Sequence, residues 1–401
     1  MTLSSFGSLR RRRKQLRKSA ERSCSRRGLL ELLERRDLFC GDFSQESSAS
    51  SLLAHADTDT TLADEVANGI PTQPADSVGI LSGMISSFST LANGIPILHS
   101  RPSAPTAIYL DFDGDATASM LPYNEDSDST TFNSSEQATI VEAWRETSLY
   151  FAPFDIDVTT IQPSAGTPTA WAAASNSVTG RDYSGIGVFP NSYARSYVSA
   201  NSARTRGSAF AHELGHNFGL QHQSDYDLVG VKTAEYSSGY DALHGPIMGV
   251  DYAQSVHKWF LGHATPSPST LQNDVTIIAN KIKPYQGAGG DGFRPDDFGN
   301  TIAAATPLTN SGSMQVAAGV IERLTDVDAF SFTSNGSPLI VSALPDTPSA
   351  LDAKLEIYDS AGTLIAAKDG STNLQSIPLT LPAGTYYALV SSHGNFGDMG
   401  A

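Results

Sequence analysis

One eleven-residue stretch constrains this chain more than any other feature: residues 212–222 read HELGHNFGLQH. His212 and His216 are four residues apart, so on a helix both side chains lie on one face, about one turn apart. Gly219 can adopt the left-handed backbone conformation that ends a helix, so the chain can turn back and bring His222 toward the other two histidines. The stretch therefore predicts a helix, a sharp turn and three imidazoles around one point.

Three neutral imidazoles are a typical ligand set for Zn²⁺, and three protein ligands leave a fourth position for water, as in a catalytic site. Other divalent ions can also bind three imidazoles, so zinc is inferred from the type of ligand. Glu213 follows the first histidine and lies about 100° around the helix from it, close enough to hydrogen-bond a water molecule without binding the metal. The residues therefore predict one catalytic metal ion.

The same stretch matches the HExxHxxGxxH motif of the metzincin zinc metallopeptidases, and the chain resembles that family over about residues 105–265. Residues 245–249, GPIMG, are similar to its Met-turn. The resemblance implies that His212, His216 and His222 bind zinc. It also implies that Glu213 is the general base, which takes a proton from water and passes it to the leaving amine, and that Met248 packs beneath the ligands.

Further candidates lie close to the Met-turn. Some metzincins carry a tyrosine two residues after the methionine; here that position is Val250, and the nearest tyrosine is Tyr252. A catalytic role for Tyr252 competes with its interpretation as a packed aromatic residue. We interpret the other histidines of this region as loop or surface residues: His244, His257 and His263.

The metzincin resemblance implies a mixed sheet with long helices in the catalytic region, and apolar patterning predicts individual elements of it. The expected elements are strands over 107–112, 155–161 and 185–189, and helices over 134–151, with a serine cap, and 204–218. Upstream, 1–40 reads as a basic leader or arm, and 41–104 as a low-complexity linker or propeptide. Downstream, the Pro- and Gly-rich composition of 266–294 predicts a linker.

Residues 295–401 show short alternating segments separated by turn residues, a pattern typical of an all-β sandwich. Strands are expected over 329–333, 339–343, 354–358, 364–368, 377–381 and 385–390. The segments DDFGN, DVDAFSF, LEIYD and PAGTYY resemble the bacterial pre-peptidase C-terminal (PPC) domain. Because that family continues with one more strand, we expect either a fragment or a sandwich without an edge strand. Asp326 and Asp328 could hold Ca²⁺, although turn formation is the stronger interpretation.

Charge and cysteine content narrow the function classes. The chain carries 26 Lys and Arg against 42 Asp and Glu, and its basic residues are concentrated in the first 40 positions. A strongly acidic remainder makes nucleic-acid binding by the folded part unfavourable. The sequence lacks an apolar run long enough for a transmembrane helix. Both cysteines, Cys24 and Cys40, lie in the basic segment, so no disulfide supports the fold after residue 40.

We therefore expect an α+β metzincin-like catalytic domain followed by an all-β sandwich. The predicted function is a secreted or cell-surface zinc endopeptidase acting on protein or peptide substrates. Bacterial-type export is suggested by the basic leader, in which residues 33–36, LERR, resemble the leaders of some exported surface proteins, but no conventional signal peptide is clear. The alternative is a non-catalytic extracellular surface or adhesion protein with a vestigial metal site. The sequence leaves the oligomeric state open.

Overall fold

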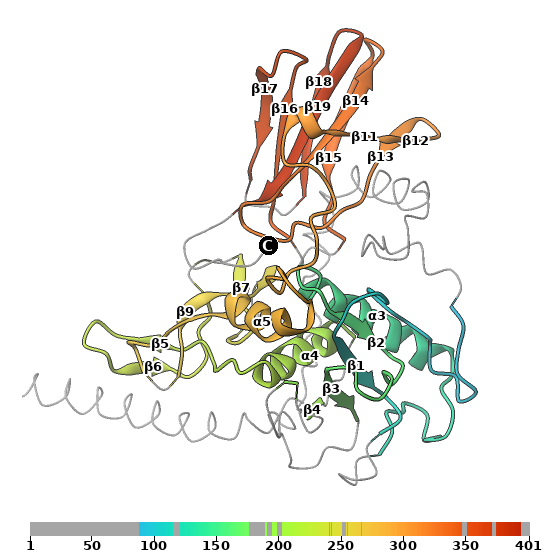
Figure 1. Ribbon diagram of the computed structural model, residues 1–401, viewed down its shortest axis with the longest axis vertical. Coiled ribbons are helices and arrows are strands. Elements are labelled where there is room, and N and C mark those ends of the chain that lie inside the picture. Colours follow the sequence, from blue (N-terminus) through green and yellow to red (C-terminus); the bar gives the residue numbers. More distant parts are fainter. Residues whose placement is uncertain are drawn as a thin grey trace, which may run out of the picture. The chain divides into compact units, whose positions relative to one another are not determined.

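The structure is a computed structural model. It describes residues 88–114, 121–175, 189–190, 195–198, 203–239, 241, 243–250, 254, 256–265, 267–346, 351–370 and 374–393. The described residues before about position 293 form a mixed α/β region, and the described residues after it form a β-rich region (Figure 1). Each region has its own hydrophobic cluster. The strand over 185–189 and both cysteines fall in parts of the chain outside the described residues, apart from Phe189.

The α/β region contains three described α-helices and ten short strands. The helices are α3 (Ser134–Tyr150), α4 (Ala203–Asn217) and α5 (Asp274–Ile282), the last continued by the 3-10 turn η4 (Lys283–Tyr285). The strands are β1 (Ala107–Asp111), β2 (Asp157–Thr159), β3 (Thr169–Ala174), β4 (Arg195–Val198), β5 (Asp225–Tyr226), β6 (Lys232–Ala234), β7 (His244–Pro246), β8 (Val256–Lys258), β9 (Leu261–His263) and β10 (Leu271–Asn273).

The central sheet has the order β2-β1-β3-β4, and each of its described pairs is parallel. Ile108 of β1 pairs with Val158 on one side and with Ala170 on the other. Parallel neighbours need a crossover connection, which α3 supplies between β1 and β2. We expected a mixed sheet; the four described strands run parallel, and the further strand expected over 185–189 lies outside the described residues apart from Phe189. Strand β3 was not predicted, because its run of alanines lacks the branched residues typical of strands.

Helix α3 begins where the sequence predicts, but its cap differs from the expected serine. The Asn133 side chain accepts hydrogen bonds from the backbone N–H groups of Ser135 and Glu136, and the Glu136 carboxylate accepts one from the Asn133 N–H. This reciprocal arrangement is a capping box. Further along, the indole Nε1 of Trp144 donates to the carbonyl of Val158 over 2.7 Å, which ties the helix to β2.

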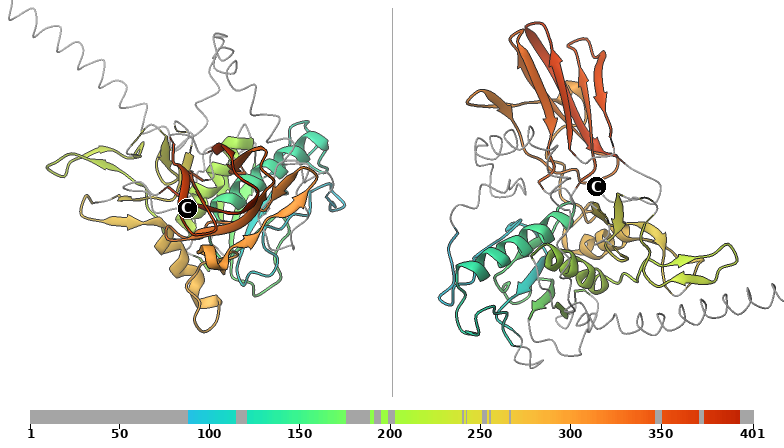
Figure 2. Two further views of the ribbon diagram at one scale, coloured as in Figure 1. Left: turned by 90° about the horizontal axis from the view of Figure 1, so that it is seen from above. Right: turned by 180° about the vertical axis from the view of Figure 1, so that it is seen from behind.

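Helices α3 and α4 lie side by side in both sets of views (Figures 1 and 2). Gly207 permits this approach, because a Cβ atom at this position would collide with the carboxylate of Glu146. The hydroxyl of Thr147, also on α3, lies 3.5 Å from the carbonyl oxygen of Gly207. The helix that carries the first two predicted metal ligands is therefore held closely against α3.

Two stretches that we expected to be linkers contribute to the α/β core. Ile95 and Leu98, from the end of the polar segment 41–104, are 2% and 6% exposed. In 266–294, the chain forms α5, and Ile278 and Ile282 of this helix are fully buried. A few well-placed apolar residues suffice to anchor segments whose overall composition is typical of linkers.

The β-rich region contains the six strands that the alternating pattern predicts, with ends within two residues of the expected ones. Its elements are η5 (Ile302–Ala304), β11 (Thr306–Pro307), β12 (Thr309–Ser311), β13 (Met314–Val316), β14 (Val327–Ser334), β15 (Pro338–Ala343), β16 (Ala353–Tyr358), β17 (Leu364–Lys368), β18 (Gln375–Thr380) and β19 (Gly384–Ser392). Five strands form a sheet in the order β11-β14-β19-β16-β17, and β15 pairs with β18. Apolar residues from both sheets share one cluster, which includes Phe332, Leu355 and Ile377.

The burial of α5 leads to a stability prediction. Replacing Ile278 with Ala should lower the free energy of unfolding of the α/β region by about 2–5 kcal/mol, because it removes buried methyl groups and leaves a cavity. Replacing the exposed Asn280 on the same helix with Ala should change it by less than about 0.5 kcal/mol. Urea unfolding of both variants would measure the difference, and equal stability would contradict the packing described for α5.

Candidate metal centre

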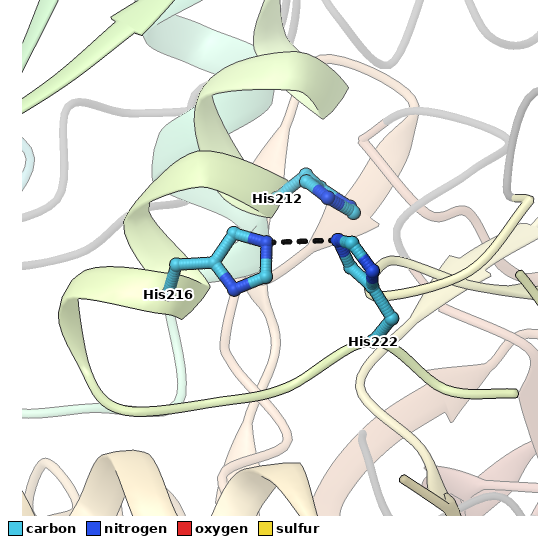
Figure 3. Close-up of side chains that lie close together, drawn as sticks. All are labelled: His212, His216 and His222. Carbon is cyan, nitrogen blue, oxygen red and sulfur yellow. Dashed lines mark hydrogen bonds between the residues drawn. The ribbon is translucent and has the colours of Figure 1, made fainter. Parts of the chain in front are cut away.

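The three predicted ligands come together at the end of α4. His212 and His216 project from the same face of the helix (Figure 3). The helix ends at Asn217, and Gly219 follows with φ of +95°, in the left-handed region that glycine tolerates. The chain then reverses and brings His222 opposite the helix, as the spacing of the motif predicts.

The three imidazoles face a common point. At least one ring nitrogen from each lies within 4.8 Å of the others, and the Nε2 atoms of His216 and His222 are 3.1 Å apart. The ring of His212 is 5.0 Å from that of His216, centroid to centroid, and 5.4 Å from that of His222. His212 is 6% exposed, whereas the other two are partly accessible. The centre therefore combines one ligand anchored in the core with two that solvent can reach in part.

Hydrogen bonds at Nδ1 orient the two helical ligands. The Nδ1 atom of His212 lies 2.7 Å from the carbonyl oxygen of Ile247, and that of His216 lies 2.8 Å from the carbonyl oxygen of Leu220. Because a carbonyl oxygen can only accept, Nδ1 must carry the proton in each ring. The lone pair of the neutral ring is then on Nε2, which is the arrangement that a metal ligand requires.

The third ligand is oriented by a carboxylate. Nδ1 of His222 lies 3.0 Å from Oε1 of Glu235, and the ammonium of Lys232 lies 2.6 Å from the other carboxylate oxygen. Burial opposes the ionisation of Glu235, but hydrogen bonds from Lys232, His222 and Thr265 outweigh it and lower the pKa of this carboxyl group. Sequence reasoning missed Glu235, which belongs to no part of the motif.

Met248 lies where the resemblance to a Met-turn places it. Its side chain is fully buried, and a Cβ atom on Gly215 of α4 would lie 2.5 Å from its sulfur atom. The sulfur therefore packs directly on the helix between the two helical ligands. The carbonyl of Met248 also accepts a hydrogen bond from the N–H of Gln223, the residue after the third ligand.

A buried carboxylate supports the same segment. The side-chain amide of Gln223 donates to Oδ1 of Asp274 over 3.0 Å, and the N–H of Phe260 donates to Oδ2. Gln272 donates to Oδ1 as well. Burial raises the pKa of Asp274 to about 7, while these donors act in the opposite direction. Helix α5, which begins at this residue, thus helps to position the loop that carries His222.

Tyr236 is a second residue that the motif did not reveal. Its ring centroid lies 4.4 Å from that of His222 and 6.3 Å from that of His212. The predicted Tyr252, by contrast, lies outside the described residues. Glu213 follows the first ligand on α4 and is partly exposed, so its carboxylate is not sealed in the core.

The remaining histidines do not join this centre. His263 is exposed, as expected, but two of the three are buried. Nδ1 of His244 pairs with Asp241 over 2.9 Å, and Nδ1 of His257 lies 2.8 Å from the Tyr150 hydroxyl. The interpretation of both as loop or surface residues is therefore wrong. His244 lies on β7 and His257 on β8, and each has a polar partner that compensates its burial.

Comparison with known families addresses the same part of the chain. Residues 121–223 match the model described as metallo-peptidase family M12B, reprolysin-like. The match runs from the segment before α3 to the residue after His222, about a quarter of the chain, and it supports a zinc metallopeptidase domain. Comparison with curated proteins gives no match for this chain. Among the described residues, no helix is both long and apolar enough to span a membrane.

The role of Glu235 can be tested through metal affinity. Replacing Glu235 with Ala should weaken zinc binding about 10–100-fold, because the Nδ1 edge of His222 loses the acceptor that orients it. Replacing it with Gln keeps an acceptor oxygen in place and should cost less. Competition with a chromophoric chelator at neutral pH would measure both, and unchanged affinity in the alanine variant would contradict the role assigned to this carboxylate.

Proposed function

We propose that this chain is a zinc-dependent endopeptidase of the metzincin type, with His212, His216 and His222 as the metal ligands. The observation that carries the proposal is the convergence of three imidazoles whose Nδ1 atoms are all engaged away from the centre. The ligand set fits zinc, since it consists of three neutral nitrogen donors and leaves room for a further ligand. The reprolysin-like match over 121–223 supports the same function.

Zinc in this position would act as a Lewis acid toward the peptide carbonyl and lower the pKa of water toward ~7. Glu213 would accept the proton of the attacking water on its carboxylate and return it to the leaving amine nitrogen. Its place next to His212 on α4, with a partly exposed side chain, suits this task. Met248 would support the ligands from below without taking part in proton transfer.

The proposal also covers where the protein acts and how its β-rich region folds. We propose that the protein is secreted or held at the cell surface, since its basic N-terminal segment resembles the leaders of exported surface proteins. The β-rich region would be a PPC-like sandwich. Its support is a hydrophobic cluster shared by the five-stranded sheet and the β15–β18 pair. The substrates would be proteins or peptides.

Replacing Glu213 with Gln tests the function. The variant should keep its zinc, because the three imidazoles are untouched, and should lose about 10²–10⁴-fold in peptide hydrolysis, the usual contribution of a general base. Replacing His216 with Ala should lose both zinc and activity. Zinc content and cleavage of a peptide library, followed by mass spectrometry, would measure these effects.

A matched control is Glu142→Gln, which changes an exposed carboxylate of α3 away from the metal centre. This variant should cleave the library as the wild type does. If neither the zinc-loaded wild type nor Glu213→Gln cleaved the library, the result would favour the alternative function, a non-catalytic surface protein with a vestigial metal site.

A further inference from the structure

Five carboxylates gather where the chain enters the β-rich region. We call them the acidic cluster: Asp296, Asp297, Glu322, Asp326 and Asp328. They form two overlapping groups of three, which share Asp296, and the candidate ligand oxygens within each group lie within 4.8 Å of one another. This spacing matches calcium coordination, since two oxygens bonded to one ion at 2.3–2.6 Å are at most about 5 Å apart.

Burial distinguishes this cluster from an ordinary acidic surface. Glu322, Asp326 and Asp328 are only 1%, 5% and 3% exposed. Among the described residues, neither carboxylate oxygen of Glu322 has a hydrogen-bond partner, and the Oδ1 atoms of Asp326 and Asp328 have none either. Buried polar atoms normally have a partner, and a buried carboxylate without one carries a large desolvation cost.

Nearby positive charge is too small to balance the cluster. Nε of Arg294 lies 3.4 Å from Oε1 of Glu322, and its Nη2 lies 3.8 Å from Oδ2 of Asp297. This guanidinium contributes a single positive charge near five carboxyl groups. Burial, reinforced by the neighbouring carboxyl groups, raises the pKa of Glu322 to about 10 and that of Asp328 to about 8. Without a bound cation, each ionised carboxylate therefore disfavours the ionisation of its neighbours.

The surrounding backbone holds the carboxylates in place. Oδ2 of Asp326 accepts a hydrogen bond from the N–H of Glu322 over 2.9 Å, and Oδ2 of Asp297 accepts one from the N–H of Val320. Gly319 approaches so closely that a Cβ atom there would lie 2.7 Å from Oδ2 of Asp328. The carboxylates thus come from two segments of chain, 296–297 and 322–328, and nearby backbone groups contact the acidic side chains directly.

We propose that the acidic cluster is a calcium-binding site, distinct from the three-histidine centre and independent of the peptidase function. All of its donors are oxygens, which suit Ca²⁺ and do not favour zinc. Mg²⁺ usually keeps several waters and binds through one or two carboxylates, whereas this cluster supplies five. Asp296 is exposed and gives the ion access to the buried members.

Calcium bound here would join two segments that are distant in sequence. Asp296 and Asp297 precede η5, whereas Glu322 and Asp326 lie in the loop before β14, and Asp328 lies on that strand. The ion would therefore fasten the entry segment to the five-stranded sheet. We expect it to stabilise the β-rich region without contributing to peptide hydrolysis.

The test uses the full chain, stripped with a chelator and resupplied with one equivalent of Zn²⁺. Calorimetric titration with CaCl₂ up to about 10 mM, the range that covers weak extracellular sites, should show binding. The unfolding temperature should rise by at least about 5 °C. The double variant Asp326→Asn/Asp328→Asn should lose both responses. Without calcium it should be at least as stable as the wild type, since neutral amides relieve the repulsion among the crowded carboxyl groups.

Two controls sharpen the interpretation. Asp291→Asn changes an exposed carboxylate that pairs with Arg323, the residue after Glu322, and should respond to calcium as the wild type does. His212→Ala should lose zinc and keep its calcium response, which separates this proposal from the peptidase. The proposal would be overturned by a wild type that shows no calcium response, by an equal response in the double variant, or by equal stabilisation with MgCl₂.

Discussion

The metal centre depends on three hydrogen bonds, each made by an Nδ1 atom on the side of the ring away from the centre. Without them, an imidazole could rotate or change tautomer, and the lone pairs would no longer meet. Two acceptors are backbone carbonyls, of Ile247 and Leu220, and the third is the carboxylate of Glu235. Three neutral nitrogen atoms with facing lone pairs do not attract one another, whereas all three could bind a cation placed between them.

Much of the surrounding α/β region holds those acceptors in place. The carbonyl of Ile247 directly precedes Met248, whose sulfur packs on Gly215 between the two helical ligands. Asp274 ties α5 to the residue that follows His222. The contacts that pack the core therefore also orient the ligands. A residue such as Asp274 can thus affect the orientation of His222 without touching the centre.

Local patterns were sufficient to predict that the three imidazoles converge. The four-residue spacing on a helix and the glycine turn determine where His212, His216 and His222 go, and neither depends on distant parts of the chain. Glu235 and Tyr236 could not be found in this way. They lie in an irregular segment whose path is set by tertiary hydrogen bonds, such as that from the N–H of Ser237 to the carbonyl of Gln223.

The predictions from composition were less reliable, because the composition of a segment does not show which of its residues make tertiary contacts. Polar and Pro-rich stretches were interpreted as linkers, yet Ile95 and Ile278 anchor them in the α/β core. Strict alternation, which is also a local signal, located the strands of the β-rich region well. For the acidic cluster, the sequence drew attention to Asp326 and Asp328, but the burial of Glu322 beside them became visible only in three dimensions.

X-ray absorption at the zinc edge of the purified protein tests the central claim most directly. We predict one zinc ion with three imidazole nitrogens at about 2.0–2.1 Å and one further light atom from solvent, which a hydroxamate should replace. A zinc ion with four protein ligands that does not respond to hydroxamate would indicate a closed structural site. Protein that binds no zinc would contradict the account entirely.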